Sequence, residues 1–297
     1  MIKYLKLKKG LDLKLLNSLL LTTFIFTGCS QNNLNTNNNS TLNINKITEC
    51  KVLENEKDRI ICHLEKAKNG NVKSQTWLGY YYNVGKVVPK DKVKANFWFT
   101  KAAMQNDLYS QRELAINYIE KKDYKNALIW LEKASNQNDK VALRELAYLY
   151  DLGHGVEIDK NKAFGLFKKA ALQGDMIAQN EVGFYYEMGW VVKKDYKTAI
   201  QWYVQTAKKE NLFGLHKMGA FYAKGYGVPQ NYKESYKWFR KAAVNGNKDS
   251  MQWLGLFYEQ GNGVDRNYAK AKVLYEKSGS DFSKNRLKIM RDKRLIK

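Results

Sequence analysis

Proline is almost absent from this 297-residue chain, which contains only two. Pro89 and Pro229 both fall in short segments between helix-patterned stretches, and neither interrupts such a stretch. Because proline breaks a helix when it lies inside one, this placement agrees with a helical chain.

The three histidines are far apart in the sequence and lack the H-x-x-x-H spacing of a zinc site. The sequence therefore predicts no metal site and no cofactor.

Signatures of catalysis are also missing. No serine is followed by lysine at the third position after it, so the S-x-x-K arrangement that activates a nucleophilic serine is absent. Segments of the form GxGV occur, but they lie between two helical stretches rather than after a strand, as a phosphate-binding loop would. We therefore predict no catalytic residues and no enzyme activity.

No apolar run at the N-terminus is long enough to cross a bilayer. Residues 15–26 form the strongest run, which is shorter than the roughly 20 residues that a membrane-spanning helix needs. Five lysines and one aspartate precede it in residues 1–14, an order typical of a signal peptide. We predict a signal peptide over residues 1–28.

The end of this run is similar to a bacterial lipobox, in which a cysteine is lipidated and becomes the mature N-terminus. Phe26, Thr27 and Gly28 stand before Cys29. We predict lipid attachment at Cys29 and anchoring to the bacterial cell envelope, with Ser30 favouring the outer membrane over the inner. The alternative is an ordinary signal peptide followed by a chance cysteine. Residues 30–45 are half asparagine, so we expect residues 29–45 to be a disordered tether.

A period of 36 residues organises the rest of the chain. Gly183, Gly219 and Gly255 are separated by this interval, and each follows a large apolar residue and precedes a tyrosine by three positions. Asp195, Asn231 and Asn267 repeat in step with them. Six units run over residues 74–281, the second of which is four residues short, and half of another unit precedes them. A fixed period of this size is typical of stacked helical repeats.

These units resemble the Sel1-like repeat family, a relative of the tetratricopeptide repeat. The stretches MGAFYAKGYGVPQNYKESYKWFRKAAVNG from Met218 and LGLFYEQGNGVDRNYAKAKVLYEKS from Leu254 carry the resemblance. It implies an all-α, α/α solenoid of about six helix–loop–helix repeats plus an N-terminal half repeat. It also implies a scaffold for protein–protein interaction. Some exported, cysteine-rich relatives carry a β-lactamase label, but they have a cysteine pair in each repeat, whereas these six repeats have none.

Each unit carries start and stop signals for its helices. Asp159, Asp195, Asn231 and Asn267 stand where the second helix should begin, and Asp and Asn are good N-cap residues. Glycines of the GxGV segments stand where the first helix should end, where they can adopt the left-handed conformation.

The resemblance also indicates where a partner would bind. In tetratricopeptide-like arrays the first helices line the concave face, and we expect exposed positions two before, two after and five after the buried apolar residue. These positions include Tyr80, Asn83, Arg112, Arg144, Tyr148, Asp151, Asn180, Phe184, Glu187 and His216.

Two cysteines remain once Cys29 is set aside, an even pair in an exported and oxidising setting. In the repeat frame Cys62 aligns with Trp130 and Cys50 with Tyr118, with Asn55 as the N-cap between them. We predict a disulfide between Cys50 and Cys62 that closes a capping hairpin over residues 46–73. Two buried free thiols are the alternative.

Positive charge is in excess. The net charge is +22, and +18 once residues 1–28 are removed. Residues 282–297 hold seven basic residues and one acidic residue, and we expect this basic tail to cap the last repeat. The excess favours anionic partners, although a lysine-rich composition that is merely solvated is the alternative.

Three functions follow as hypotheses. The first is a monomeric, lipid-anchored scaffold that binds protein partners through the concave face and meets no nucleic acid. The second is a binder of anionic envelope polymers through the basic surface. The third, disfavoured by the missing S-x-x-K pattern, is a β-lactamase-like hydrolase.

Overall fold

The computed structural model describes Cys50 and residues 53–297, so the predicted signal peptide, Cys29 and the asparagine-rich tether lie outside the described residues. Within this range the regular structure consists of fourteen α-helices and no strand. The chain divides into two compact units, Met1–Asp123 and Tyr124–Lys297, which we call the N-terminal and C-terminal units. The prediction of an all-α fold is confirmed.

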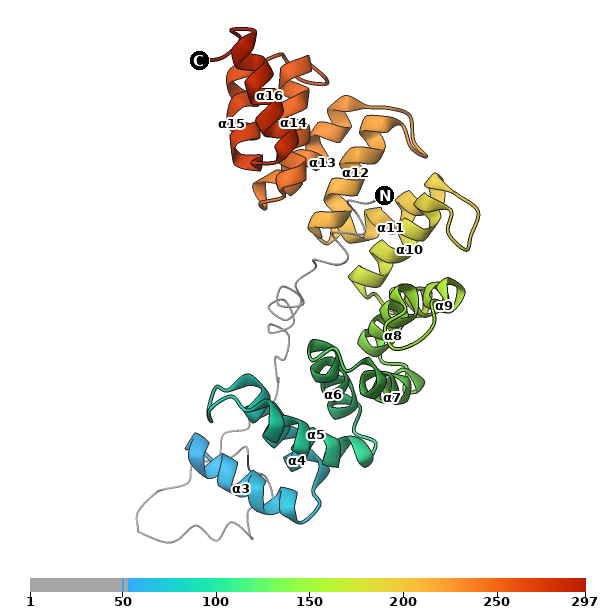
Figure 1. Ribbon diagram of the computed structural model, residues 1–297, viewed down its shortest axis with the longest axis vertical. Helices are drawn as coiled ribbons and strands as arrows, with labels where there is room; N and C mark the ends of the chain where they lie inside the picture. The colour runs from blue at the N-terminus through green and yellow to red at the C-terminus, as the bar shows by residue number, and fades with distance from the viewer. Residues whose placement is uncertain (1–49, 51–52) are drawn as a thin grey trace, which may run out of the picture. The chain divides into compact units, whose positions relative to one another are not determined.

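Four helices make up the described part of the N-terminal unit, and each packs against the next along the chain (Figure 1). They are α3 (Glu56–Lys68), α4 (Val72–Val84), α5 (Lys92–Met104) and α6 (Leu108–Glu120). The helix α3 is the second helix of the expected half repeat, and Asn55 is its N-cap, as predicted.

Ten helices make up the C-terminal unit, again with each packed against the next. They are α7 (Tyr124–Asn136), α8 (Lys140–Leu152), α9 (Lys160–Leu172), α10 (Met176–Met188), α11 (Tyr196–Lys208), α12 (Leu212–Lys224), α13 (Tyr232–Val244), α14 (Lys248–Gln260), α15 (Tyr268–Ser278) and α16 (Asp281–Asp292). The even-numbered helices α8 to α14 are first helices of repeats, and the odd-numbered helices are second helices.

The helices begin and end where the sequence signals stand. The side chains of Asp159, Asp195, Asn231 and Asn267 accept hydrogen bonds from backbone N–H groups in the first turns of α9, α11, α13 and α15. Gly225 ends α12 with φ +70°, a backbone conformation that only glycine adopts without strain. Both sets of predicted caps are confirmed.

The glycine of the repeat frame sets the distance between the two helices of a repeat. A Cβ atom on Gly219 would lie 2.6 Å from the ring of Phe239, which is fully buried. Gly183 and Gly255 meet Tyr203 and Tyr275 in the same way. A glycine costs about 0.5–1 kcal/mol in a helix interior relative to alanine, and the buried aromatic ring offsets this cost.

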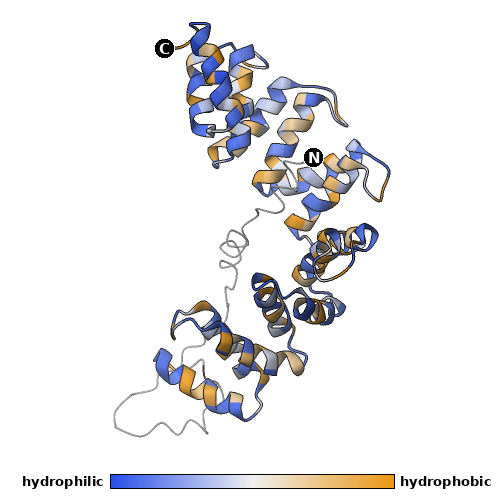
Figure 2. Ribbon diagram, in the orientation of Figure 1, coloured by the Kyte–Doolittle hydropathy of each residue, from blue (hydrophilic) through white to orange (hydrophobic). Residues whose placement is uncertain are grey.

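Apolar and polar residues are interspersed along each helix, as expected of amphipathic helices (Figure 2). Among the described residues, no helix combines the length and the apolar character needed to cross a membrane.

The last helix closes the array. Leu287 and Met290 of α16 are buried in one cluster with Ala271 and Tyr275 of α15. Basic residues of α16 such as Lys284 and Lys288 remain exposed. The helix therefore covers the apolar side of the last repeat with a basic outer surface.

A disulfide joins Cys50 to Cys62 of α3, with 5.7 Å between their Cα atoms. Both cysteines are buried. This is the pairing that the repeat frame predicts, and the bridge fixes the chain before α3 to the side of α3 itself.

Candidate functional site

The ten residues expected to bind a partner are carried by five first helices. Tyr80 and Asn83 lie in α4, and Arg112 lies in α6. The remaining seven lie in the C-terminal unit, in α8, α10 and α12, and we call them the first-helix face: Arg144, Tyr148, Asp151, Asn180, Phe184, Glu187 and His216.

The sequence predicts that these positions are exposed, and for four of them the prediction is wrong. Arg144 and Asp151 are only 5% and 3% exposed, and Asn180 and Phe184 are also buried. The other six residues are half-buried. The repeat frame gives the direction of a side chain on its own helix, but it does not include the side chains of the next repeat, which cover these positions.

Arg144 shows how this covering occurs. Its Nη1 donates to Oδ2 of Asp175 at 2.7 Å, and its Nη2 donates to Oε1 of Glu145 at 2.6 Å. Asp175 is the N-cap residue of α10, so Arg144 ties α8 to the start of the next first helix. Burial alone would lower the pKa of Arg144, but Glu145 and Asp175 outweigh it and raise the pKa. The guanidinium is a structural cation between two repeats.

The position five residues after the buried apolar residue carries a recurring acid. Asp151, Glu187 and Glu259 each accept a hydrogen bond from a tyrosine hydroxyl and pair with a cation. The partners are Tyr185 and Lys160 for Asp151, Tyr203 and Lys217 for Glu187, and Tyr275 and Arg286 for Glu259.

These acids hold helices together. Burial and the hydrogen bond to Asp151 raise the pKa of Tyr185 well above its ordinary range, and Tyr275 behaves in the same way beside Glu259. Both tyrosines therefore stay neutral donors. The predicted site residues Asp151 and Glu187 belong to contacts within the unit, a use that the sequence analysis missed.

His216 also contacts the next repeat. Its Nδ1 lies 2.9 Å from Oγ of Ser250 in α14, a fully buried hydroxyl. Burial lowers the pKa of His216 to about 4, with nearby Lys217 and Lys224 acting in the same direction and Asp249 against it. The imidazole is therefore neutral near pH 7.

An aromatic cluster surrounds the predicted residue Tyr80 in the N-terminal unit. Trp77 packs edge-on against Tyr80 and lies stacked against Tyr81 and His63. Burial, followed by Lys66 and Arg59, lowers the pKa of His63 to about 4. Trp77 lies three positions before the predicted site residue Tyr80 and is exposed, and it does not belong to the recurrent tryptophan position of the second helices.

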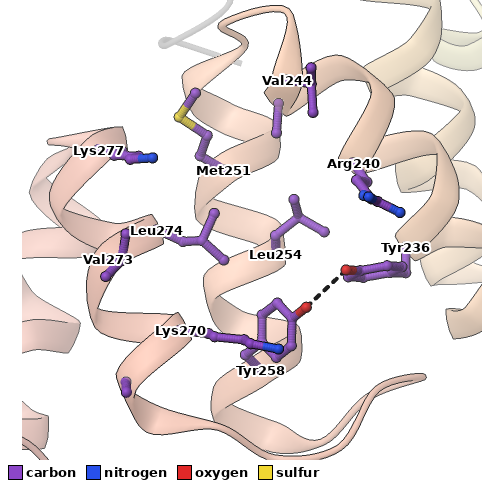
Figure 3. Close-up of a pocket in the computed structure, with 12 residues that line it drawn as sticks. Tyr236, Arg240, Val244, Met251, Leu254, Tyr258, Lys270, Val273, Leu274 and Lys277 are labelled. Atoms are coloured by element: carbon purple, nitrogen blue, oxygen red, sulfur yellow. Dashed lines mark hydrogen bonds between the residues drawn. The ribbon is translucent and has the colours of Figure 1, made fainter.

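A groove lies between the second helices α13 and α15, with the first helix α14 as its floor, and encloses about 510 Å³ (Figure 3). We call it the α13–α15 groove. Most of its lining is apolar, and Tyr236 and Tyr258 close one end with a hydrogen bond of 2.8 Å between their hydroxyls. None of its twelve lining residues is among the predicted site residues. In residues 53–297, no group of His, Cys, Asp and Glu could hold a metal ion.

Comparison with known protein families identifies the repeats of this chain. A family model described as the Sel1 repeat matches six segments, residues 72–107, 110–139, 140–175, 177–211, 213–247 and 248–280. The chain belongs to the Sel1 repeat family. The predicted resemblance is confirmed. Sel1 repeat proteins typically serve as scaffolds for protein–protein interaction.

Two solved structures of Sel1-type proteins are similar over most of this chain. A protective antigen present in uropathogenic Escherichia coli strains is 31% identical with a TM-score of 0.74, over 80% of this chain and 52% of the antigen. A Sel1 repeat protein from Oxalobacter formigenes is 30% identical with a TM-score of 0.66, over 74% of this chain and 92% of the other. The chain thus spans about half the length of the E. coli antigen. A search of curated proteins found no match.

Proposed function

We propose that this Sel1 repeat chain is exported, anchored to the bacterial cell envelope through lipid on Cys29, and acts there as a scaffold that binds other proteins. The disulfide between Cys50 and Cys62 is the main support for an exported location, because disulfides persist in oxidising compartments and are rare in the cytosol. The signal-like residues 1–28 and the FTGC sequence point in the same direction. The description of the E. coli relative as a protective antigen favours export as well.

The scaffold function rests on the repeat array. Stacked repeats present a long surface, and such surfaces are generally used to bind extended partners. No titratable group of the first-helix face stands alone in a cleft, as a catalytic acid or base would. The acids Asp151 and Glu187 are instead paired with tyrosines and lysines.

Fractionation of Cys29→Ala tests the anchor. We expect the variant to leave the membrane fraction, because the lipid is attached at this residue and two or more acyl chains are needed for stable anchoring. Cys50→Ser/Cys62→Ser is the matched control and should stay with the membrane. Unchanged fractionation of Cys29→Ala would disprove the anchor.

Crosslinking in intact envelopes tests the scaffold. We expect a small set of proteins to crosslink to the wild-type chain, and the set to shrink when Cys29→Ala removes the chain from the membrane. Alkylation without reduction should leave Cys50 and Cys62 unmodified. Two freely alkylated thiols in protein from the envelope would argue against an oxidising compartment.

A second function is favoured by α16. Leu287 and Met290 of this helix are buried against α15, and its basic residues such as Lys284 and Lys288 are exposed on its outer surface. Such a surface suits anionic envelope polymers or lipid headgroups. Binding of this kind should fall steeply with added salt, because screening shortens to about 3 Å at 1 M. Binding of a protein partner through apolar contacts should persist in part.

A further inference from the structure

The α13–α15 groove lies where the last repeat departs from the repeat before it. Trp238 of α13 is half-buried and packs against the cluster of Tyr203 and Met218. One repeat later, the same frame position holds Leu274. Lys233 and Lys237 are likewise replaced by Ala269 and Val273. The side chains of α15 are therefore smaller and less polar than those of α13 at three equivalent positions, and Ala269, Val273 and Leu274 all line the groove.

The groove combines an apolar floor with a cationic rim (Figure 3). Leu254 and Leu274 form part of the floor, and the adjoining Val244 and Val273 are 78% and 48% exposed. Apolar surface left open in this way is unfavourable in water and is typical of a contact site.

Three cations border this apolar surface, namely Arg240, Lys270 and Lys277. No acidic residue is among the lining residues of the groove. All three side chains are exposed. Among the described residues, neither Arg240 nor Lys277 forms an ion pair with a carboxylate. Their charges remain available to an acidic partner.

We propose that the α13–α15 groove binds an amphipathic helix of a partner protein, with apolar side chains on the floor and acidic side chains against Arg240, Lys270 and Lys277. The inference rests on the proposed scaffold function and names a surface and a partner chemistry for it. The lining residues of α13 run from Tyr236 to Val244, which is about 12 Å of helix. That length suits two turns of a docked helix with anchors at i, i+3, i+4 and i+7.

Charge argues against two other occupants of the groove, the N-terminal segment of this chain and a second copy of it. Residues 1–28 carry five lysines and one aspartate, so the apolar N-terminal segment would bring more positive charge to a cationic rim. A second copy of the chain carries a net charge of +22 and meets the same repulsion. The helix α16 is already packed on the opposite side of α15 through Leu287 and Met290.

Two designed peptides test the proposal against the full chain. Both are 18-residue helical peptides with leucine at i, i+3, i+4 and i+7, one flanked by glutamates and the other by lysines. By fluorescence anisotropy at low salt, the glutamate peptide should bind at least about tenfold tighter. Leu274→Trp restores the residue of the preceding repeat and should weaken that binding about tenfold or more.

A matched pair of charge reversals isolates the rim. Lys277→Glu should weaken binding of the glutamate peptide about fivefold. Lys241→Glu lies at the same frame position one repeat earlier and outside the groove, and it should change binding less than about twofold. Circular dichroism confirms that each variant is folded before its binding is compared.

Several results would overturn the proposal: equal binding of the two peptides, unchanged binding by Leu274→Trp, or equal effects of the two reversals. The proposal would also fail if Leu274→Trp weakened binding of anionic phosphatidylglycerol vesicles but not binding of the peptide. It would fail as well if the chain formed a dimer that Leu274→Trp dissociates. If the groove fails while crosslinking in envelopes still captures the same proteins with Leu274→Trp, the scaffold function stands without it. If the wild-type chain captures none, the scaffold function itself fails.

Discussion

Cations of the C-terminal unit are used in two different ways. On the first-helix face, Arg144 is buried and bound to Asp175 and Glu145, and Lys217 is bound to Glu187. At the α13–α15 groove, Arg240 and Lys277 are exposed and border an apolar surface. The first set joins one repeat to the next, whereas the second set is available to a partner. The cations that border the apolar groove therefore lie beside Leu274, where α15 departs from the repeat before it.

The largest expected effect is on stability at the first-helix face. Arg144→Glu places a third carboxylate beside Glu145 and Asp175 and leaves all of them without a cation. Removing one partner of a buried ion pair costs about 3–5 kcal/mol of unfolding free energy. Arg240→Glu, the same charge reversal at the groove, should cost less than about 0.5 kcal/mol. Urea unfolding measures both, and similar costs would remove the distinction between the two surfaces.

A second effect comes from pH. His216 has a pKa of about 4 when folded and an ordinary value near 6.5 when unfolded. The unfolded chain therefore binds more protons between these values, so the stabilising contribution is complete above pH 6.5 and is lost as pH falls towards 4. The loss should reach about 3 kcal/mol at most.

The variant His216→Gln isolates this contribution. The difference in unfolding free energy between pH 7 and pH 4.5 should shrink relative to the wild-type chain. His63 and the paired carboxylates remain in both proteins and cancel in the comparison. An identical pH dependence in the two proteins would contradict the burial of a neutral imidazole.

Tyr203→Phe probes the recurring acid with a smaller effect. The variant removes the hydroxyl that donates to Glu187 but leaves the pairing of Glu187 with Lys217. A hydrogen bond to a charged group contributes about 1.5–3 kcal/mol, and we expect the lower end because the lysine remains. Tyr222→Phe is the control, since its hydroxyl forms no hydrogen bond with the described residues. Equal costs would mean that the tyrosine–acid contact contributes little to repeat stacking.

Local features of the fold were predictable because they depend on residues close in sequence. The N-caps at Asp195 and Asn231, and the left-handed Gly225, follow from the conformational preferences of single residues. Burial of Arg144 was not predictable, because its partner Asp175 lies 31 residues away in the next repeat. A period identifies equivalent positions, but the chemistry of each contact between repeats depends on which pair of side chains meets there.

The groove had a sequence signal that a search for regular positions passes over. Trp98, Trp130, Trp202 and Trp238 occupy one frame position, at which Leu166 stands in the third repeat and Leu274 in the last. A missing large side chain predicts open space only when the neighbouring helices do not close it. Whether α13 and α15 stay apart is a matter of backbone packing, which the sequence pattern does not contain.

The smallest expected effect on stability comes from reversing the charge of Lys277 at the groove rim. We compare it with the same reversal at Lys241, because the two variants should rank in opposite orders for stability and for peptide binding. Lys241 places its Nζ 5.4 Å from the ring of Trp238, a contact that contributes about 0.5–1 kcal/mol at an exposed site. At the position equivalent to Trp238, the repeat that contains Lys277 has Leu274, which offers no ring for such a contact. Lys241→Glu should therefore lower the midpoint of urea unfolding slightly more than Lys277→Glu does. Binding of the glutamate peptide should follow the opposite order, because only Lys277 lines the groove. If Lys277→Glu proves more destabilising than Lys241→Glu, the charge at residue 277 serves the fold, and the distinction between the two sets of cations no longer holds.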